Sequence, residues 1–221
     1  MQKILFWLGA VIFILCPYAG LGASNPQEVM ARVQARYDKA GAFKVRFRQE
    51  SRLMAANQAE VAEGVMYFQK PCRMRWQYEN PPEQQKEIVS DGRQVWMYTP
   101  QDSLVMIYQL NKVLRSDLVM RFFSGMGQFR QDFKVSWGQP PKEGEAYVID
   151  LFPLKEAPEL KRLTLTINPL SFLVEKLEFT NALGEESRFA FSQPQLDLSL
   201  KPDFFTFVPP AGVQVVREGP G

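Results

Sequence analysis

Histidine is absent from the 221-residue sequence, which removes the commonest general base and the commonest metal ligand of proteins. Neither a Ser-His-Asp nor a Cys-His catalytic arrangement can therefore be drawn. The adjacent carboxylates Glu185 and Glu186 follow Gly184 in an expected turn, where we expect both to be solvated. The stretch 124–127 ends an apolar helix, whereas a phosphate-binding loop opens one. We expect no enzyme, no catalytic residue, no metal and no cofactor.

Long apolar runs are confined to the N-terminus. Lys3 precedes the apolar run 4–15, and small residues follow up to Ala23. This is the pattern of a secretory signal peptide, and the run is too short to span a bilayer comfortably. We therefore expect residues 1–23 to be a signal peptide and residues 24–221 to form a single exported, soluble domain.

Cysteine is also scarce, with two residues in the chain. Cys16 lies in the expected signal peptide. A competing interpretation makes it the lipid-modified cysteine of a bacterial lipoprotein, although Leu15 stands where such signals have a small residue. After signal removal only Cys72 remains, so an intrachain disulfide is excluded. We expect Cys72 to be a buried or incidental thiol.

An excess of charge of one sign is missing too, because the formal net charge is +2. Such a balance creates no field that demands nucleic acid or an anionic membrane. Basic and apolar residues alternate in 44–48 and in 73–76, so that a strand places the cations on one face and the apolar groups on the other. Sheets that bind nucleic acid place aromatic and basic groups on one face. We expect a solvated convex face, with a docking surface for an acidic partner as the alternative.

The periodicity of apolar residues predicts two helices and many strands. Asn25 caps a helix that carries Val29, Val33 and Tyr37 at helical spacing and ends at Gly41. A second helix is expected to begin at Ser116. Alternation of period two and the turn residues between segments predict strands. They cover 43–48, 61–69, 73–78, 87–89, 95–98, 103–110, 129–137, 145–151, 161–167, 172–180 and 186–192.

One strand lacks the usual alternation. In I-V-S-D-G-R-Q-V-W-M-Y-T-P, residues 88–100, Asp91 and Gly92 indicate a hairpin, and residues 95–98 are apolar in succession. Both faces of that strand need a dry environment, which predicts one curved antiparallel sheet with helices on its concave face. The chain has 17 Phe, 7 Tyr, 4 Trp and 9 Met. Such residues serve surfaces that repack around apolar ligands, and they also simply fill cores.

The stretch 88–100 closely resembles the strand-turn-strand signature of the LolA family of periplasmic lipoprotein carriers, and F-T-F-V-P-P-A-G-V-Q-V (205–215) resembles the tail of that family. The segments F-R-Q-E (47–50), F-Q-K-P (68–71) and R-W-Q-Y-E-N-P (75–81) follow in the family's order. The resemblance implies a mainly β fold with some α: an unclosed antiparallel β-barrel covered by a helical lid, with an apolar cavity for acyl chains between them.

The resemblance further implies a carrier in the periplasm of a Gram-negative bacterium. Its expected partners are acylated lipoproteins, an inner-membrane transporter that releases them and an outer-membrane acceptor, and the working state is a monomer. The lid side of the acyl site is expected from an apolar helix, namely Leu118, Val119, Phe122, Phe123 and Met126. Its sheet side is expected from Phe47, Met74, Trp76, Trp96, Tyr98 and Leu165, although a shift of one residue inverts the facing of a strand.

The sequence departs from the family at the proline of F-Q-K-P. The family usually has an arginine before this proline, and hydrogen bonds from it to the lid hold the empty form closed. Here Lys70 occupies the position, with Arg73 and Arg75 as alternative latches. Lysine offers a point charge where arginine offers a planar fork. Two other functions stay open: a binding module of the same fold for another amphiphile, such as a glycolipid, or a lipoprotein sensor; and an envelope protein with structural or enzymatic work.

Overall fold

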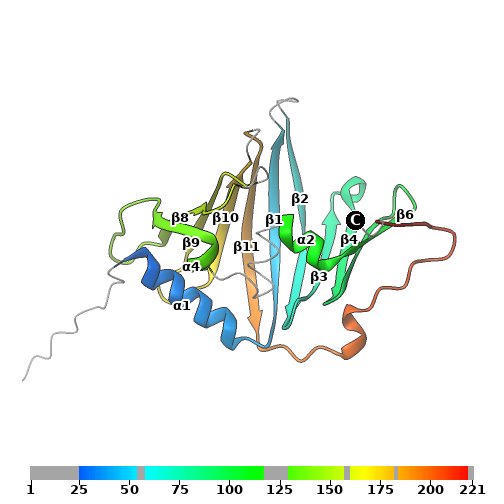
Figure 1. Ribbon diagram of the computed structural model, residues 1–221, viewed down its shortest axis with the longest axis horizontal. Helices are drawn as coiled ribbons and strands as arrows, with labels where there is room; N and C mark the ends of the chain where they lie inside the picture. Colours follow the sequence, from blue (N-terminus) through cyan, green and yellow to red (C-terminus); the bar gives the residue numbers. More distant parts are fainter. Residues whose placement is uncertain (1–24, 54–57, 117–128, 157–159, 182–183, 219–221) are drawn as a thin grey trace, which may run out of the picture.

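The structure is a computed structural model that describes residues 25–53, 58–116, 129–156, 160–181 and 184–218. Over these residues the chain is mainly β, with one curved, unclosed sheet and few helices (Figure 1). Twelve described strands run in the order β12-β6-β5-β4-β3-β2-β1-β11-β10-β9-β8-β7. Neighbours pair antiparallel except β12, which runs parallel to β6. The two meanders β1–β6 and β7–β11 therefore join through the β1–β11 pair.

Helix α1 (Pro26–Lys39) forms as its sequence predicts. The Asn25 side chain accepts a hydrogen bond from the Glu28 amide at 2.7 Å, which satisfies one of the free N–H groups of the first turn. Val29, Met30 and Val33 are buried and belong to the same apolar cluster as the sheet residues. Helix α1 therefore packs against the sheet through one face.

The first meander contains β1 (Ala42–Leu53), β2 (Gln58–Gln69), β3 (Arg73–Asn80), β4 (Lys86–Asp91), β5 (Gln94–Thr99) and β6 (Leu104–Gln109), with the 3-10 turn η1 (Pro82–Gln84) before β4. The predicted hairpin at Asp91-Gly92 is present. Asp91 Oδ1 accepts from the Arg93 and Gln94 amides at 2.7 and 2.9 Å, while Gly92 adopts a φ of 97°. A side-chain acceptor and a left-handed glycine thus close the turn.

The second meander contains β7 (Phe133–Trp137), β8 (Tyr147–Pro153), β9 (Arg162–Ile167), β10 (Val174–Thr180) and β11 (Glu186–Leu196). The 3-10 turn η2 (Pro202–Phe205) and β12 (Gln214–Arg217) complete the chain. No sequence pattern predicted β12 as a strand. Its residues are all exposed, and only the backbone ladder to β6 defines it.

Two boundaries in the middle of the chain differ from the sequence prediction. The predicted strand 103–110 ends at Gln109, and Leu110 begins α2 (Leu110–Ser116), where it is buried and its amide donates to the Arg93 carbonyl. The helix predicted from Ser116 onward lies outside the described residues. The predicted strand 129–137 begins with the short helix α4 (Phe129–Asp132), and only 133–137 is strand. At Leu110 a tertiary contact thus overrides the local periodicity.

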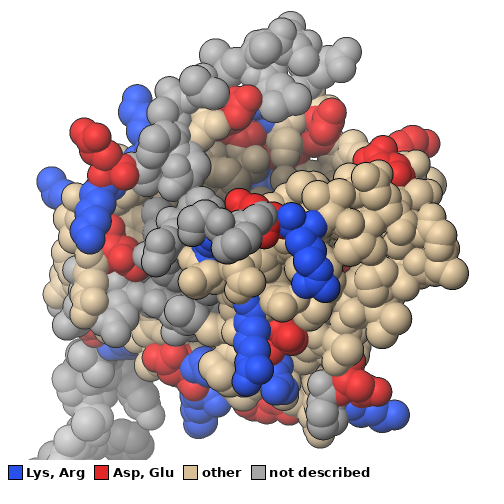
Figure 2. Space-filling view, turned by 45° about the vertical axis from the view of Figure 1, so that its right-hand side comes forward, with Lys and Arg blue, Asp and Glu red and all other residues tan. Residues whose placement is uncertain are grey.

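The sheet has two faces of different character. The inner face, defined as the one that packs against α1, carries Phe43, Val45 and Phe47 of β1. The residues that pair with them in β2 and β11 extend this apolar face on either side. The outer face carries Arg46, paired with Glu79 at 2.9 Å, and Arg48, paired with Glu63 at 3.2 Å. The sequence prediction of a cationic face opposite an apolar face holds for β1. On the side seen in Figure 2, Lys and Arg are interspersed with Asp and Glu.

Candidate functional site

The inner face is a continuous apolar surface with an aromatic centre. The ring centroid of Trp76 lies 6.5 Å from that of Phe47, 6.0 Å from Phe68 and 6.4 Å from Phe189. Phe47 also meets Tyr78 edge-on at 4.9 Å. These contacts join β1, β2, β3 and β11 at the middle of the sheet. Their edge-to-face and tilted geometry is the arrangement that aromatic pairs prefer.

Four of the sheet residues expected at the site share this face. Phe47, Met74 and Trp76 are buried in the cluster at the centre, and Leu165 belongs to the same cluster in the second meander. Register connects them, because Leu165 pairs with Leu177 and Leu177 with Phe189. Sequence reasoning did not single out Met66, Phe68 or Phe189. Met66 and Phe68 alternate with Val65 and Tyr67, so that both faces of β2 are apolar and the pattern does not distinguish them.

The inner face changes character along the strands. Inner positions of β1 are Phe43, Val45 and Phe47, followed by Gln49 and Ser51 toward the hairpin that joins β1 to β2. Tyr78 Oη donates to Gln49 Oε1 at 2.9 Å, and Gln49 Nε2 donates to Ser51 Oγ at 2.9 Å. Ser51 Oγ lies 3.4 Å from Ser187 Oγ. We call Gln49, Ser51, Tyr78 and Ser187 the polar row. The inner face is thus apolar at the end that carries Phe43, which we call its base, and polar at the end near the β1–β2 hairpin.

A cavity of about 200 Å³ lies at the base of the inner face. Its walls come from the last turns of α1, from β1 and from the second meander, and include Tyr37, Phe43, Val45, Val174, Phe191 and Leu196. Tyr37 meets Phe43 edge-on at 5.3 Å, and the Tyr37 hydroxyl accepts from the Val174 amide at 3.2 Å. Beside the cavity, the Tyr37 side chain thus joins the end of α1 to β1 and to the start of β10.

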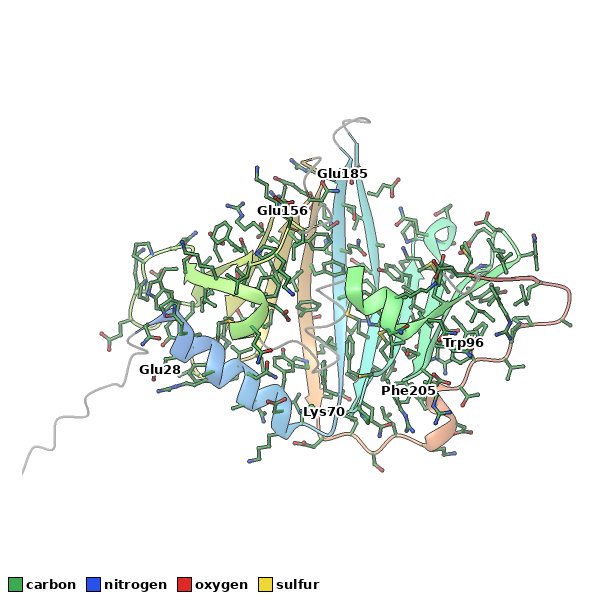
Figure 3. All side chains as sticks on the ribbon, in the orientation of Figure 1. Glu28, Lys70, Trp96, Glu156, Glu185 and Phe205 are labelled. Atoms are coloured by element: carbon green, nitrogen blue, oxygen red, sulfur yellow. The ribbon has the colours of Figure 1, made fainter. Side chains whose placement is uncertain are left out.

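Trp96 and Tyr98 lie on the outer face and not with Met74 and Trp76. Trp96 pairs with Val89, which pairs with Arg75, while Val95 and Met97 take the inner positions of β5. The C-terminal segment covers these outer residues: Phe205 is 1% exposed, the Tyr98 and Phe207 rings lie 5.7 Å apart, and Arg75 donates to the Phe204 carbonyl at 2.7 Å. Figure 3 labels Trp96 and Phe205 in the same part of the molecule. Both faces of β5 are therefore covered, as its composition requires.

Lys70 joins the end of β2 to the end of α1. Its ammonium donates to the Asp38 backbone carbonyl at 2.7 Å and to Asp38 Oδ1 at 2.9 Å, and Figure 3 shows Lys70 next to the last turn of α1. A cation at this position pairs with a carbonyl that has no partner within the helix. It also interacts favourably with the negative, C-terminal end of the helix dipole. Arg75 instead forms a 2.6 Å ion pair with Glu87 on the outer face, and Arg73 donates to Gln69. The structure places neither arginine in contact with a described α-helix.

The five expected lid residues lie outside the described residues, as do the expected signal peptide and Cys16. These residues are Leu118, Val119, Phe122, Phe123 and Met126. The described helices give no test of a lid formed by that segment. In the described part of the chain, no helix is both long and apolar enough to cross a membrane.

Burial changes the pKa of three described side chains. It raises the pKa of Tyr37 to about 12, against the lowering effect of the Val174 hydrogen bond and of Arg36. It raises the pKa of the Cys72 thiol, which works against the thiolate needed for nucleophilic chemistry. It lowers the pKa of Lys86, whose ammonium lies 4.2 Å from the Tyr78 ring centroid, while the charge of Glu60 opposes this shift. Within the described ranges, no cluster of three Cys, Asp or Glu side chains is placed to hold a metal ion.

Known proteins match this chain over most of its length. The family model described as outer membrane lipoprotein carrier protein LolA matches residues 38–208. An outer-membrane lipoprotein carrier protein of Nitrosomonas europaea is 28% identical over 157 residues, which cover 71% of this chain and 73% of that protein. A protein of the same name from Alkalilimnicola ehrlichii is 24% identical over 214 residues, which cover 96% of this chain and 95% of its own.

A solved structure also shares the fold. A conserved protein from Thermus thermophilus superposes with a TM-score of 0.56 at 14% identity, over 87% of this chain and 98% of that one. At that identity the likeness concerns the fold alone. The family model, in contrast, matches well over half of the sequence. The chain belongs to the LolA family of outer membrane lipoprotein carrier proteins.

Proposed function

We propose that the protein is a periplasmic carrier that shields the acyl chains of lipoproteins and moves them from an inner-membrane transporter to an outer-membrane acceptor. The observation that carries this proposal is the continuous apolar inner face, with Trp76, Phe47 and Phe189 at its centre, in a chain of the LolA family. Acyl chains are the apolar part of a lipoprotein. The inner face supplies the matching surface.

The transfer needs a carrier because water opposes it. Each acyl CH₂ group exposed to water is unfavourable by about 0.8 kcal/mol, so a triacylated protein faces a barrier of tens of kcal/mol. A carrier that replaces water by aromatic and methionine side chains removes most of this barrier. It needs no catalytic group to do so.

The cavity at the base of the inner face is small for the proposed cargo. Ligand pockets measure about 300–1,000 Å³, and a dry cavity of about 150 Å³ holds one benzene. The cavity of about 200 Å³ at the base of the inner face is therefore too small for several acyl chains. Binding requires that elements packed on the inner face move away, and the contacts they lose offset part of the favourable burial of the ligand. Affinity then stays moderate and release needs no nucleotide.

Two parts of the chain are assigned to this opening. Lys70 holds the end of α1 through Asp38, and we assign it as the latch. The apolar helix expected around 118–126 is assigned as the lid, with Leu118, Val119, Phe122, Phe123 and Met126 on its inner side. Opening breaks the contacts between Lys70 and Asp38 and moves the expected lid, and release of the cargo reverses both changes.

A dye-displacement assay tests the proposal with the mature protein. A dye that fluoresces in apolar surroundings is bound first, and a synthetic triacylated cysteine lipopeptide is then titrated against it. The proposal predicts saturable displacement by the lipopeptide and none by the same peptide without acyl chains. Displacement by a glycolipid but not by the lipopeptide would contradict the lipoprotein cargo and favour a carrier of another amphiphile.

A further inference from the structure

A polar group lies unused in the middle of the apolar inner face. The indole Nε1–H of Trp76 is buried and has no hydrogen-bond partner among the described residues, and the residue as a whole is 5% exposed. Leaving a buried donor unpaired is unfavourable, so such groups are rare in native structures and need an explanation. Replacing the indole by a phenyl ring would keep the aromatic packing without this penalty. The unpaired N–H is thus the feature of the inner face that needs an explanation.

The chemistry of indole limits what can pair with it. The Nε1–H is a donor only, so its partner must be an acceptor. The rings within reach, Phe47, Phe68 and Phe189, offer none. In an acylated ligand, the acceptor nearest to the hydrocarbon is the carbonyl oxygen of the ester or amide that attaches the chain. This group must enter the apolar site if the whole chain is to be shielded.

The polar row gives the direction in which such a ligand lies. Trp76 and Tyr78 are successive inner positions of β3, and Tyr78 leads to Gln49, Ser51 and Ser187 at the hairpin end. On the other side of Trp76, Met74 and Phe43 lead to the base and its cavity. Trp76 thus lies between the hydrocarbon-like part of the inner face and its polar end.

We propose that Trp76 Nε1–H donates a hydrogen bond to the acyl carbonyl of the ligand, with the chain toward Phe43 and the polar head toward the polar row. This inference rests on the proposed carrier function and adds to it a substrate class: chains attached through an ester or amide, as distinct from ether-linked alkyl chains. Trp76 fixes the depth and the orientation of the chain. The aromatic rings around it supply the apolar contact, which does not depend on the linkage.

A binding cycle between protein and ligand tests the hydrogen bond. The two probes are dioctanoylglycerol and its dioctyl ether analogue, which has the same chains without the carbonyl groups. Trp76→Phe removes the N–H and keeps an aromatic ring. We expect this variant to bind the ester probe about 2- to 12-fold more weakly relative to the ether probe, the range for one neutral hydrogen bond. Tyr67→Phe, on the outer face of the neighbouring strand, is the matched control and should bind both probes as the wild type does.

An NMR measurement on the wild type needs no variant to fold. In the ¹⁵N-labelled mature protein, the indole N–H signal of Trp76 should move downfield with the ester probe and not with the ether probe. Equal weakening of both probes by Trp76→Phe, or an indole signal that responds identically to both, would overturn the hydrogen bond and leave the carrier function intact. A wild-type protein that binds neither probe would overturn this inference, while displacement by the triacylated lipopeptide decides separately whether the proposed function stands.

Discussion

The substitution Lys70→Leu tests the latch between the sheet and α1. The Lys70 ammonium makes two contacts, with the Asp38 carbonyl at 2.7 Å and with Asp38 Oδ1 at 2.9 Å. Leucine keeps most of the aliphatic volume and removes both hydrogen bonds. The last turn of α1 then loses these contacts with Lys70, while Val29, Met30 and Val33 still pack against the core.

The size of the effect follows from the exposure of the pair. The Lys70 and Asp38 side chains are 36% and 51% exposed, so solvent screens the ion pair to about 0.2–1 kcal/mol. Donation to a carbonyl in the last helical turn adds a few tenths of a kcal/mol. The closed form should lose about 1 kcal/mol in total, which is about a 5-fold change in the equilibrium between closed and open forms. The free energy of unfolding should fall by no more than that amount.

Ligand binding should change in the opposite direction. If ligand binds only the open form, the apparent affinity rises with the open fraction, so Lys70→Leu should bind the triacylated lipopeptide about 5-fold more tightly. Transfer to acceptor membranes should slow correspondingly. Asp38→Asn, which keeps the carbonyl contact and removes the ion pair, should show a smaller change of the same sign.

Lys142→Leu serves as the matched control. It removes an ion pair with Glu145 whose two side chains are 71% and 63% exposed, in the loop between β7 and β8, and should change neither affinity nor transfer. Affinity is measured by titration of the lipopeptide, and transfer by its release to vesicles. Identical affinity and transfer in Lys70→Leu and the wild type would refute the latch, because the contacts would then make no difference between closed and open forms.

Three further predictions concern stability. Gly64→Ala should destabilise the protein by about 3 kcal/mol or more in denaturant titrations, because its Cβ would overlap the Gln77 backbone oxygen in β3; a loss below about 1 kcal/mol would contradict the register there. Phe205→Ala should cost about 3–5 kcal/mol by the same measurement, and a near-neutral effect would mean that the C-terminal segment does not seal the outer face. Tyr37 contributes stability that is present below its unfolded pKa of 10.0 and is lost as the pH rises toward about 12. The melting temperature of Tyr37→Phe should therefore fall less steeply with alkaline pH than that of the wild type. Parallel pH profiles of the two proteins would refute the burial of the phenol.

Most of the fold could be predicted because the sequence marks its faces. In β1, Lys44, Arg46 and Arg48 identify the outer positions, so that Phe43, Val45 and Phe47 must face the core. The same alternation predicted that Met74 and Trp76 lie on the inner face. The family membership predicted from the two longer motifs is confirmed by the match over 38–208.

The facing of β5 could not be predicted in the same way. Val95, Trp96, Met97 and Tyr98 carry no charge that marks the solvent side, and a shift of one residue exchanges the two faces. The structure places Val95 inside and Trp96 outside because η2 and the segment after it cover the outer face. That contact joins residues about a hundred positions apart, and no local pattern encodes it.

The partner of Lys70 is another feature that the sequence did not contain. The position before Pro71 indicated a latch, but α1 is more than thirty residues away along the chain and its last carbonyls carry no sequence signal. The same is true of Trp76. The alternation of residues in β3 predicts that its ring lies inside. Whether Nε1 has a described partner depends on the neighbours that the fold assembles around it, which the sequence does not show. Contacts of this kind follow from tertiary packing.

Native mass spectrometry of the mature protein, purified gently from a periplasmic extract, tests the central claim most directly. The account predicts a complex with a triacylated polypeptide, whose added mass also gives the number of chains bound. A protein that is empty and also fails to take up an acylated peptide in vitro would contradict it, because the apolar inner face would then be no more than a core.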